Sequence, residues 1–318
     1  MALSRRASTA LAASLIAALA AYSPASTALA HPPGDSAASV SAPFADPEEA
    51  AHFADDSLRG RSGKLLARFV APDVPTSARS AFTELFGDSS LAEPGVYPVD
   101  DKSLSRPFSF IALFPFSVKR GDELGRYRVG FWPGEKRPIS GPYANPVGFI
   151  EVTPENENLH VSAHFRLRDF LTHDQARVWP KYLVLREDLI DKLELVIAQL
   201  EADGHPVRHL TVMSGFRTPQ YNATGGNTAG RDEMSRHMYG DASDVFVDND
   251  GDGRMDDLNG DGRIDYRDAQ VILAASEKVE RAYADLVGGG GVYKATRAHG
   301  PFAHIDVRGD RARWGLLQ

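Results

Sequence analysis

The 318-residue chain contains no cysteine. This absence excludes disulfide bonds, thiolate metal ligands and cysteine nucleophiles, and it removes the residue through which bacterial lipoproteins are anchored. After the N-terminal segment, no apolar run is long enough to form a transmembrane helix. The formal net charge is −8, and the acidic residues are concentrated between residues 248 and 268. The sequence shows no clustering of basic residues that would indicate a nucleic-acid partner. A protein of this size without disulfide bonds must therefore rely on its hydrophobic core for stability.

The N-terminal segment predicts export. Arg5 and Arg6 precede an apolar run from Ala10 to Ala21, and Ala28-Leu29-Ala30 supplies the small-x-small pattern of a cleavage site. The apolar run is too short to span a bilayer. We therefore expect residues 1–30 to be a signal peptide, and the mature protein to be periplasmic or secreted, without a membrane anchor.

The remaining chain divides by composition into three parts. Residues 31–57 are rich in Pro, Ala, Ser and Asp, which is typical of a flexible linker. Residues 58–155 carry the apolar run 108–114 and the alternating run 127–132 between glycine and proline turns, which predicts a small, mainly β domain of unknown role. Residues 156–318 form the third part.

This third part predicts an α+β domain. Apolar periodicity and flanking turn residues predict two helices and two strands, at 186–203, 269–287, 210–213 and 303–307. Alternate residues of a strand share a face, so His304 and Asp306 should point the same way.

A divided metal site is the main chemical signal of the sequence. Asp244 follows His237 by seven residues, and His304 lies in the last predicted strand. Two imidazoles and one carboxylate make a three-ligand zinc set, whose fourth position remains open for a water that the metal activates. The histidine pairs elsewhere in the chain have no acidic third ligand nearby, so we interpret them as structural.

Three ordered motifs, Ser214–Asn222, Ser235–Asp244 and His304–Asp306, resemble the M15 metallopeptidase family. This family contains zinc D-alanyl-D-alanine carboxypeptidases and murein endopeptidases, which share a core with the hedgehog signalling domain. The glycine-rich turn Gly288–Tyr293 and the tail Arg311–Trp314 are similar to the periplasmic murein endopeptidase branch. The resemblance begins near residue 160 and does not include the preceding region.

The resemblance implies a hedgehog/DD-peptidase-like zinc domain with His237, Asp244 and His304 as ligands. It also implies that Arg217 stabilises the oxyanion of the reaction, the alternative being a salt bridge that holds its own loop. Ser235 matches a small polar residue that either hydrogen-bonds the substrate or caps the turn before His237.

The general base departs from the family pattern. In the family, a Glu or His shortly before the last histidine activates the metal-bound water, whereas this chain has Pro301 and Phe302 there. The candidates that remain are Asp306, on the predicted strand, and His299, on a predicted loop. Asp306 fits equally well as a residue that orients a ligand histidine.

The acidic segment 248–268 contains two overlapping EF-hand-like patterns, offset by nine residues. They predict one or two structural Ca²⁺ ions, as in dockerin or thrombospondin repeats, because oxygen ligands recur at positions 1, 3, 5, 7, 9 and 12 with glycine at position 6. The predicted ligands are Asp248, Asp250, Asp252, Arg254, Asp256, Asp257, Asn259, Asp261, Arg263, Asp265 and Asp268. Position 12 is Asn in the first loop and Asp in the second, where EF-hands carry Glu. The alternatives are a solvated acidic loop and a regulatory ion.

Together these observations lead to one functional hypothesis and two rivals. The resemblance implies an exported zinc peptidase that hydrolyses peptidoglycan stem peptides or cross-links, as a D,D-carboxypeptidase or an endopeptidase. The first rival is a non-catalytic module for wall binding or adhesion, stabilised by zinc and calcium. The second is a hydrolase of the same fold that acts on other peptides.

Overall fold

The computed structural model describes residues 58–100, 104, 106–225 and 231–316. All of them belong to one compact unit, residues 46–318. The expected signal peptide and linker lie outside the described residues. Within the part that is described, no helix combines the length and apolar character that crossing a membrane would require.

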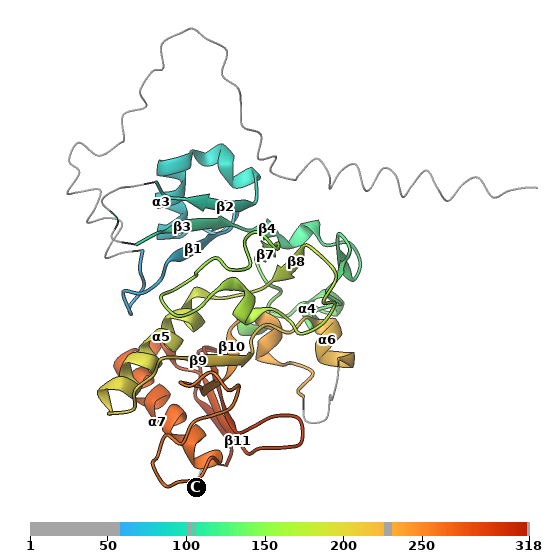
Figure 1. Cartoon of the computed structure of the whole chain (residues 1–318). Helices are drawn as coiled ribbons and strands as arrows, with labels where there is room; N and C mark the ends of the chain where they lie inside the picture. Colours follow the sequence, from blue (N-terminus) through green and yellow to red (C-terminus); the bar gives the residue numbers. More distant parts are fainter. Residues whose placement is uncertain (1–57, 101–103, 105, 226–230, 317–318) are drawn as a thin grey trace, which may run out of the picture. The chain divides into compact units, whose positions relative to one another are not determined.

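A small mixed sheet begins the described chain (Figure 1). Its strands are β1 (Ala67–Val70), β2 (Gly95–Pro98) and β3 (Ser109–Ala112), in the order β1-β3-β2. The helix α3 (Ser77–Phe86) begins where the Thr76 side chain accepts a hydrogen bond from the Arg79 N–H. It packs Phe82 against Phe110 of β3, with the two rings 5.8 Å apart. These contacts form a separate, smaller core.

A second set of short elements follows. One sheet has the order β4-β7-β8, and β5 pairs with β6 in a two-stranded ribbon. The bounds are β4 (Phe114–Pro115), β5 (Glu123–Leu124), β6 (Tyr127–Arg128), α4 (Pro133–Lys136), β7 (Gly148–Val152) and β8 (Lys181–Leu183). Short 3-10 helices link these and later elements: η1 (Asp88–Ala92), η2 (Phe116–Val118), η3 (Gly141–Tyr143), η4 (Leu167–Phe170), η5 (Arg236–Tyr239) and η6 (Ala284–Leu286).

The main core crosses the domain boundary expected between residues 155 and 156. β7 precedes this boundary and pairs with β8 beyond it. Trp132 is fully buried, stacks on Phe216 and donates its indole N–H to the Met238 carbonyl oxygen at 2.8 Å. The large aromatic residues of the first part therefore complete the core under the later motifs, and the two parts share one hydrophobic core.

The last third of the chain forms a five-stranded sheet in the order β13-β11-β12-β10-β9. All of its neighbours are antiparallel except β11 and β13, which are parallel. The bounds are β9 (Leu210–Ser214), β10 (Ala242–Val247), β11 (Gly289–Tyr293), β12 (Phe302–Asp306) and β13 (Ala312–Gly315). The helices α5 (Glu187–Ala202) and α7 (Tyr266–Ala282) pack on each other, and α7 packs on β11 and β12. The short helix α6 (Pro219–Thr224) follows β9.

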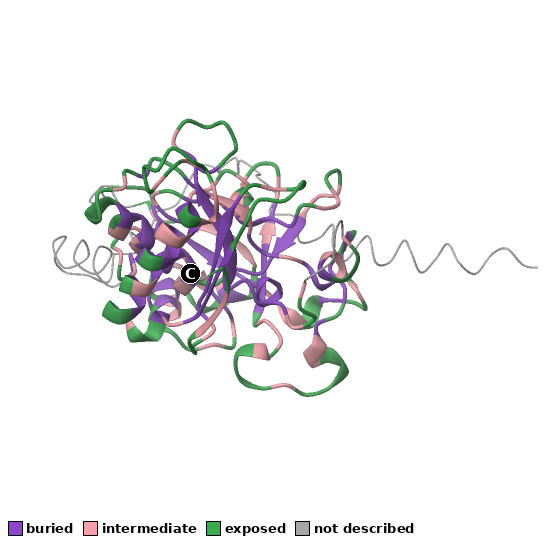
Figure 2. Ribbon diagram, turned by 90° about the horizontal axis from the view of Figure 1, so that it is seen from below, coloured by how far each residue is buried: buried purple, intermediate pink, exposed green. Residues whose placement is uncertain are grey.

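The two faces of this sheet differ in chemistry. Ala303 and Ile305 belong to the main core together with Ile272 of α7, so this set of alternate residues faces the helices. His304 and Asp306 occupy the intervening positions and face the other way. Figure 2 shows buried residues along the central strands and the inner helix faces, with exposed residues on the loops and outer helix turns.

The sequence predicted this part of the fold well. The α+β class is confirmed, as are the two helices and two strands expected between residues 186 and 307. α7 begins earlier than predicted, at Tyr266, because Asp265 caps it and the Asp268 side chain completes a capping box.

Candidate metal centre

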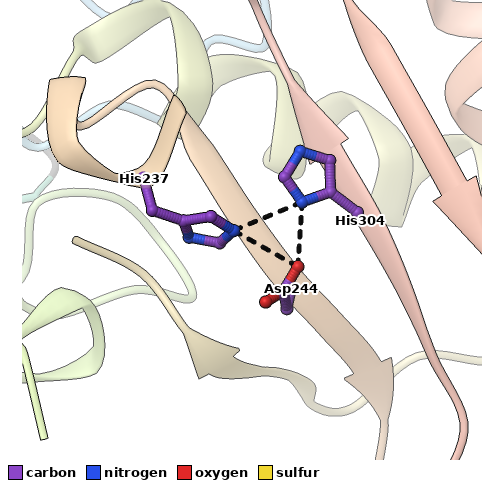
Figure 3. A group of neighbouring side chains, drawn as sticks. All are labelled: His237, Asp244 and His304. Atoms are coloured by element: carbon purple, nitrogen blue, oxygen red, sulfur yellow. Dashed lines mark hydrogen bonds and ion pairs between the residues drawn. The ribbon is translucent and has the colours of Figure 1, made fainter. Parts of the chain in front are cut away.

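Three side chains meet on the sheet face that points away from the helices (Figure 3). Asp244 of β10 and His304 of β12 are direct partners in the antiparallel pair. His237 comes from η5, which ends at Gly240 with φ 67°. A side chain at Gly240 would collide with the Val184 backbone, since its Cβ would lie 2.3 Å from the carbonyl oxygen. Glycine thus permits the tight turn that returns the chain from His237 to β10.

The spacing of the three ligand atoms suits a metal ion. His237 Nε2 lies 3.3 Å from His304 Nδ1 and 3.4 Å from Asp244 Oδ1, and His304 Nδ1 lies 2.9 Å from Asp244 Oδ1. Two atoms bonded to a tetrahedral zinc ion are about 3.3–3.4 Å apart, since each bond is about 2.0–2.1 Å long. The first two distances fit directly, and the third needs to open by only about 0.4 Å.

Hydrogen bonds on the outer sides of the rings set the histidine tautomers. His237 Nδ1 lies 2.7 Å from the carbonyl oxygen of Gly215, which only accepts hydrogen bonds. His304 Nε2 lies 3.2 Å from Oδ2 of Asp306, also an acceptor. In the neutral rings these nitrogens therefore carry the protons, and Nε2 of His237 and Nδ1 of His304 present lone pairs. With both rings neutral, three acceptors converge, counting the Asp244 carboxylate, and a metal ion would satisfy all three.

Burial and nearby charges act differently on the protonation of the three groups. The side chains of His237, Asp244 and His304 are only 4, 6 and 8% exposed. Burial lowers the pKa of His237 to about 4, outweighing the attraction of Asp244, so this ring is neutral at pH 7. Burial opposes ionisation of Asp244, yet the two histidines hold its pKa well below the usual value. Burial also opposes charge on His304, but hydrogen bonds to Asp244 and Asp306 raise its pKa. A proton or a metal ion meets the same electrostatic demand there.

Arg217 borders the cluster. Its Nη2 atom lies 2.5 Å from Asp244 Oδ2, the carboxylate oxygen outside the three-atom group, and its Nε donates to Ser214 Oγ at 2.8 Å. The salt bridge considered for Arg217 is thus present, and it also places the guanidinium beside the ligands. Ser235 immediately precedes η5 and is buried, but its side chain makes no cap hydrogen bond there, so the capping role considered for it is not observed.

Asp306 occupies the side of His304 away from the ligand atom. Its carboxylate accepts hydrogen bonds from His304 Nε2, from the Gly289 N–H at 2.7 Å, and from the Arg308 backbone and guanidinium. Because it is fully buried and faces Nε2, it is not placed to accept a proton from a water on the Nδ1 side. Of the two roles considered for Asp306, this geometry favours orientation of the ligand histidine over that of a general base.

His299 lies apart from the ligand cluster. Its side chain is half-buried, with Nδ1 2.8 Å from the Gly300 carbonyl oxygen and its ring 5.0 Å from the ring of Phe302. Phe302 begins the strand that carries His304, so this loop flanks the centre without joining the group of ligand atoms.

The glycine run of β11 has a role that sequence reasoning missed. Gly291 pairs with His304 on one side and with Trp314 of β13 on the other. A Cβ at Gly291 would lie 2.4 Å from Trp314 Nε1, so the missing side chain lets the indole lie across the strand. The indole packs 5.1 Å from the His304 ring and donates to Tyr293 Oη at 2.6 Å. The run itself was visible in the sequence, but the indole above it was not.

A second group of acidic side chains lies just beyond β10. Carboxylate oxygens of Asp248, Asp250 and Asp256 lie within 4.8 Å of one another. Asp248 accepts hydrogen bonds from the backbone N–H groups of Gly251, Asp252 and Gly253. Asp257 repeats this pattern nine residues later, with Gly260, Asp261 and Gly262 as donors. The two predicted loops therefore share one backbone form.

The other predicted calcium ligands divide between the loops and α7. Asn259 accepts from the Asp261 N–H, whereas Asp252 and Asp261 accept from the Arg254 and Arg263 N–H groups. Asp265 caps α7. Asp268 is fully buried, and its carboxylate binds the N–H groups of Leu258, Asn259 and Asp265. Asp268 thus connects the second loop to the start of α7.

Comparisons of the chain with protein-family models, curated proteins and solved structures find no match. The geometry of the centre therefore carries the functional argument.

Proposed function

We propose that this protein is an exported zinc peptidase of the M15 type, with a hedgehog/DD-peptidase-like domain, that hydrolyses peptide bonds in peptidoglycan stem peptides or cross-links. One observation carries the proposal: two histidine ring nitrogens and one carboxylate oxygen converge at mutual distances of 2.9–3.4 Å. A structural zinc site normally has four protein ligands, whereas three leave a position for water and substrate. The substrate class and the export rest on the sequence motifs.

The donor set fits zinc, and the chain supplies the remaining functions. Bound zinc would polarise the scissile carbonyl and lower the pKa of a water molecule toward neutrality. His237 and His304 would hold the ion, with their orientation fixed by the Gly215 carbonyl and by Asp306. Such outer hydrogen bonds lock the tautomer and increase the basicity of the ligand.

Arg217 combines the two roles considered for it. A guanidinium has five N–H donors, and Arg217 uses one on Asp244 and one on Ser214. The rest are available to the oxyanion that develops on the scissile carbonyl. The salt bridge to Asp244 fixes the guanidinium in advance, which removes the cost of reorganising it during the reaction. Ser235, two residues before His237, is proposed to contact the peptide substrate.

Proton transfer is proposed to involve His299. Since Asp306 faces away from the reacting side, His299 is the remaining candidate of the two considered. Its half-buried imidazole packs against Phe302, at the start of the strand that carries His304.

The acidic segment is proposed to bind one or two structural Ca²⁺ ions. The Asp248 N–H donates to the His209 carbonyl oxygen and the Asp256 N–H donates to that of Val247, so the first loop is joined to the ends of β9 and β10. Asp244 lies on β10, four residues before the loop. A cation that orders the loop should therefore stabilise the strand that holds this ligand.

One rival is a metal-stabilised module that binds cell wall without cleaving it. It needs a direct test because neither Asp306 nor His299 belongs to the ligand cluster. Purified mature protein is incubated with cross-linked muropeptides, with and without a chelator. Zinc-dependent products that disappear in His237→Ala support the peptidase. Retention on sacculi with no products from any peptide would support the binding module. Products from other peptides only would support a hydrolase of different specificity.

A further inference from the structure

Tyr293 ends β11 on the same sheet face as the metal ligands. It pairs with Phe302, and Gly291 pairs with His304. The phenol and the imidazole therefore lie on one face, two residues apart along the strands. The Tyr293 ring stacks on Phe302 with centroids 4.6 Å apart and planes at 11°. This stacking fixes the ring plane beside the centre.

The Trp314 indole fixes the hydrogen-bonding role of the Tyr293 hydroxyl. An indole N–H only donates, so in the 2.6 Å contact the Tyr293 oxygen must be the acceptor. The phenol proton therefore points elsewhere and remains free to donate. The indole is itself held between the His304 ring at 5.1 Å and the Arg308 guanidinium at 5.2 Å. A single indole thus bridges a ligand imidazole and the Tyr293 hydroxyl.

Tyr293 is more exposed than the ligand side chains and Arg217, and the charges of Asp244 and Arg217 act on its hydroxyl. The ligand side chains are 4–8% exposed, Arg217 is 16% exposed, and Tyr293 is 36% exposed. Burial of the phenol raises the pKa of Tyr293, the hydrogen bond from Trp314 lowers it in part, and the charges of Asp244 and Arg217 raise and lower it respectively. The hydroxyl is therefore protonated at neutral pH, within electrostatic range of both charged groups.

We propose that Tyr293 is a catalytic residue that donates a hydrogen bond to the oxyanion of the substrate, opposite Arg217, and that Trp314 is the positioning residue that aims it. This inference rests on the proposed peptidase function. Two donors around one developing charge stabilise the transition state more than the ground state, because the carbonyl oxygen gains charge only during the attack. Tyr293 forms no covalent bond and gives up no proton.

The test compares Tyr293→Phe, Trp314→Phe and the control Tyr266→Phe, which removes a hydroxyl at the start of α7. Each variant is measured for cleavage of a cross-linked muropeptide, for zinc affinity, and for affinity toward a phosphinate peptide that mimics the tetrahedral intermediate. For Tyr293→Phe we expect kcat and phosphinate affinity to fall by about 10²-fold, while KM and zinc affinity stay within about twofold. Trp314→Phe should lose less of both, and Tyr266→Phe should match the wild type.

The outcomes separate this inference from the function on which it rests. A wild-type protein that binds zinc but cleaves no peptide overturns both. An active wild type with an equally active Tyr293→Phe variant overturns only the role of Tyr293. Equal loss of zinc affinity and activity in Tyr293→Phe also overturns it, since the hydroxyl would then support the metal site and not the oxyanion.

Discussion

The Nδ1 atom of His304 lies 2.9 Å from Oδ1 of Asp244, its direct partner across the β10–β12 pair. Two of the three ligands therefore come from adjacent central strands, whose backbones are fixed by ladder hydrogen bonds. Sites on such elements are held more accurately than sites on loops. The candidate metal centre is in this sense preorganised, and changes to it should alter metal affinity before they alter the fold.

Removal of any one ligand should abolish tight metal binding. His237→Ala, Asp244→Ala or His304→Ala leaves two ligands, and we expect zinc affinity to fall by more than about 100-fold, beyond the loss typical of outer partners. Zinc content measured by mass spectrometry after dialysis checks this. His209→Ala, which removes an exposed histidine, should keep one zinc per chain. Equal zinc content in all four variants would show that the metal binds elsewhere.

Asp306→Asn should act through the metal. An asparagine amide can offer its N–H₂ group to His304 Nε2, which moves the ring proton to Nδ1 and blocks the ligand atom. We expect zinc affinity to fall by about 10–100-fold, measured by competition with a chromophoric chelator. Asp310→Asn, at an exposed position, is the control. If zinc affinity were unchanged while kcat collapsed, Asp306 would be the general base after all.

The three candidate ligands could be grouped from the sequence because strand periodicity and ordered motifs are local signals, and the structure brings their ligand atoms within 4.8 Å of one another. Alternation alone placed His304 and Asp306 on one face. The role of Trp314 depends on the register between β11 and β13, which no local pattern specifies. Likewise, composition changes near residue 155, yet Trp132 packs against Phe216 far along the chain. Non-local packing is thus where sequence reasoning failed, both for the core and for the residues around the site.

Gly288→Ala should strongly destabilise the sheet. A Cβ there would lie 1.9 Å from the Asp306 carbonyl oxygen, which is backbone and cannot move without displacing β12. We expect a loss of about 1–3 kcal/mol in unfolding free energy, from urea titration, as for other overpacked positions. The control is Gly300→Ala, where a Cβ meets nothing within 4 Å. Similar stability of both variants would contradict the close approach of β11 and β12.

Calcium should raise the melting temperature. An ion at about 100 times its Kd adds about 2.7 kcal/mol, or roughly 5–10 °C for a protein of this size. Asp248→Ala removes a carboxylate of the first loop and should reduce the rise, as Asp257→Ala should for the second. Asp73→Ala, which removes an exposed carboxylate outside both loops, should respond like the wild type. A melting curve insensitive to calcium would identify the segment as a solvated acidic loop.

Glu151 should make stability fall as pH rises. Burial raises its pKa above the ordinary value of 4.5, although the Tyr182 hydroxyl, 2.9 Å from its carboxylate, partly offsets this. The unfolded chain therefore loses the proton first, and stability declines between 4.5 and the higher native pKa. Glu151→Gln should remove this decline and Tyr182→Phe should deepen it, in urea unfolding at about pH 4 and about pH 7. A pH response equal in all three proteins would contradict this.

The most direct test of the central claim is anomalous diffraction at the zinc absorption edge from crystals of the mature protein grown with zinc. We expect one strong peak about 2.0–2.1 Å from His237 Nε2, Asp244 Oδ1 and His304 Nδ1, with solvent at the fourth position. A peak bound by a fourth side chain, or no peak between these three residues, would contradict the account.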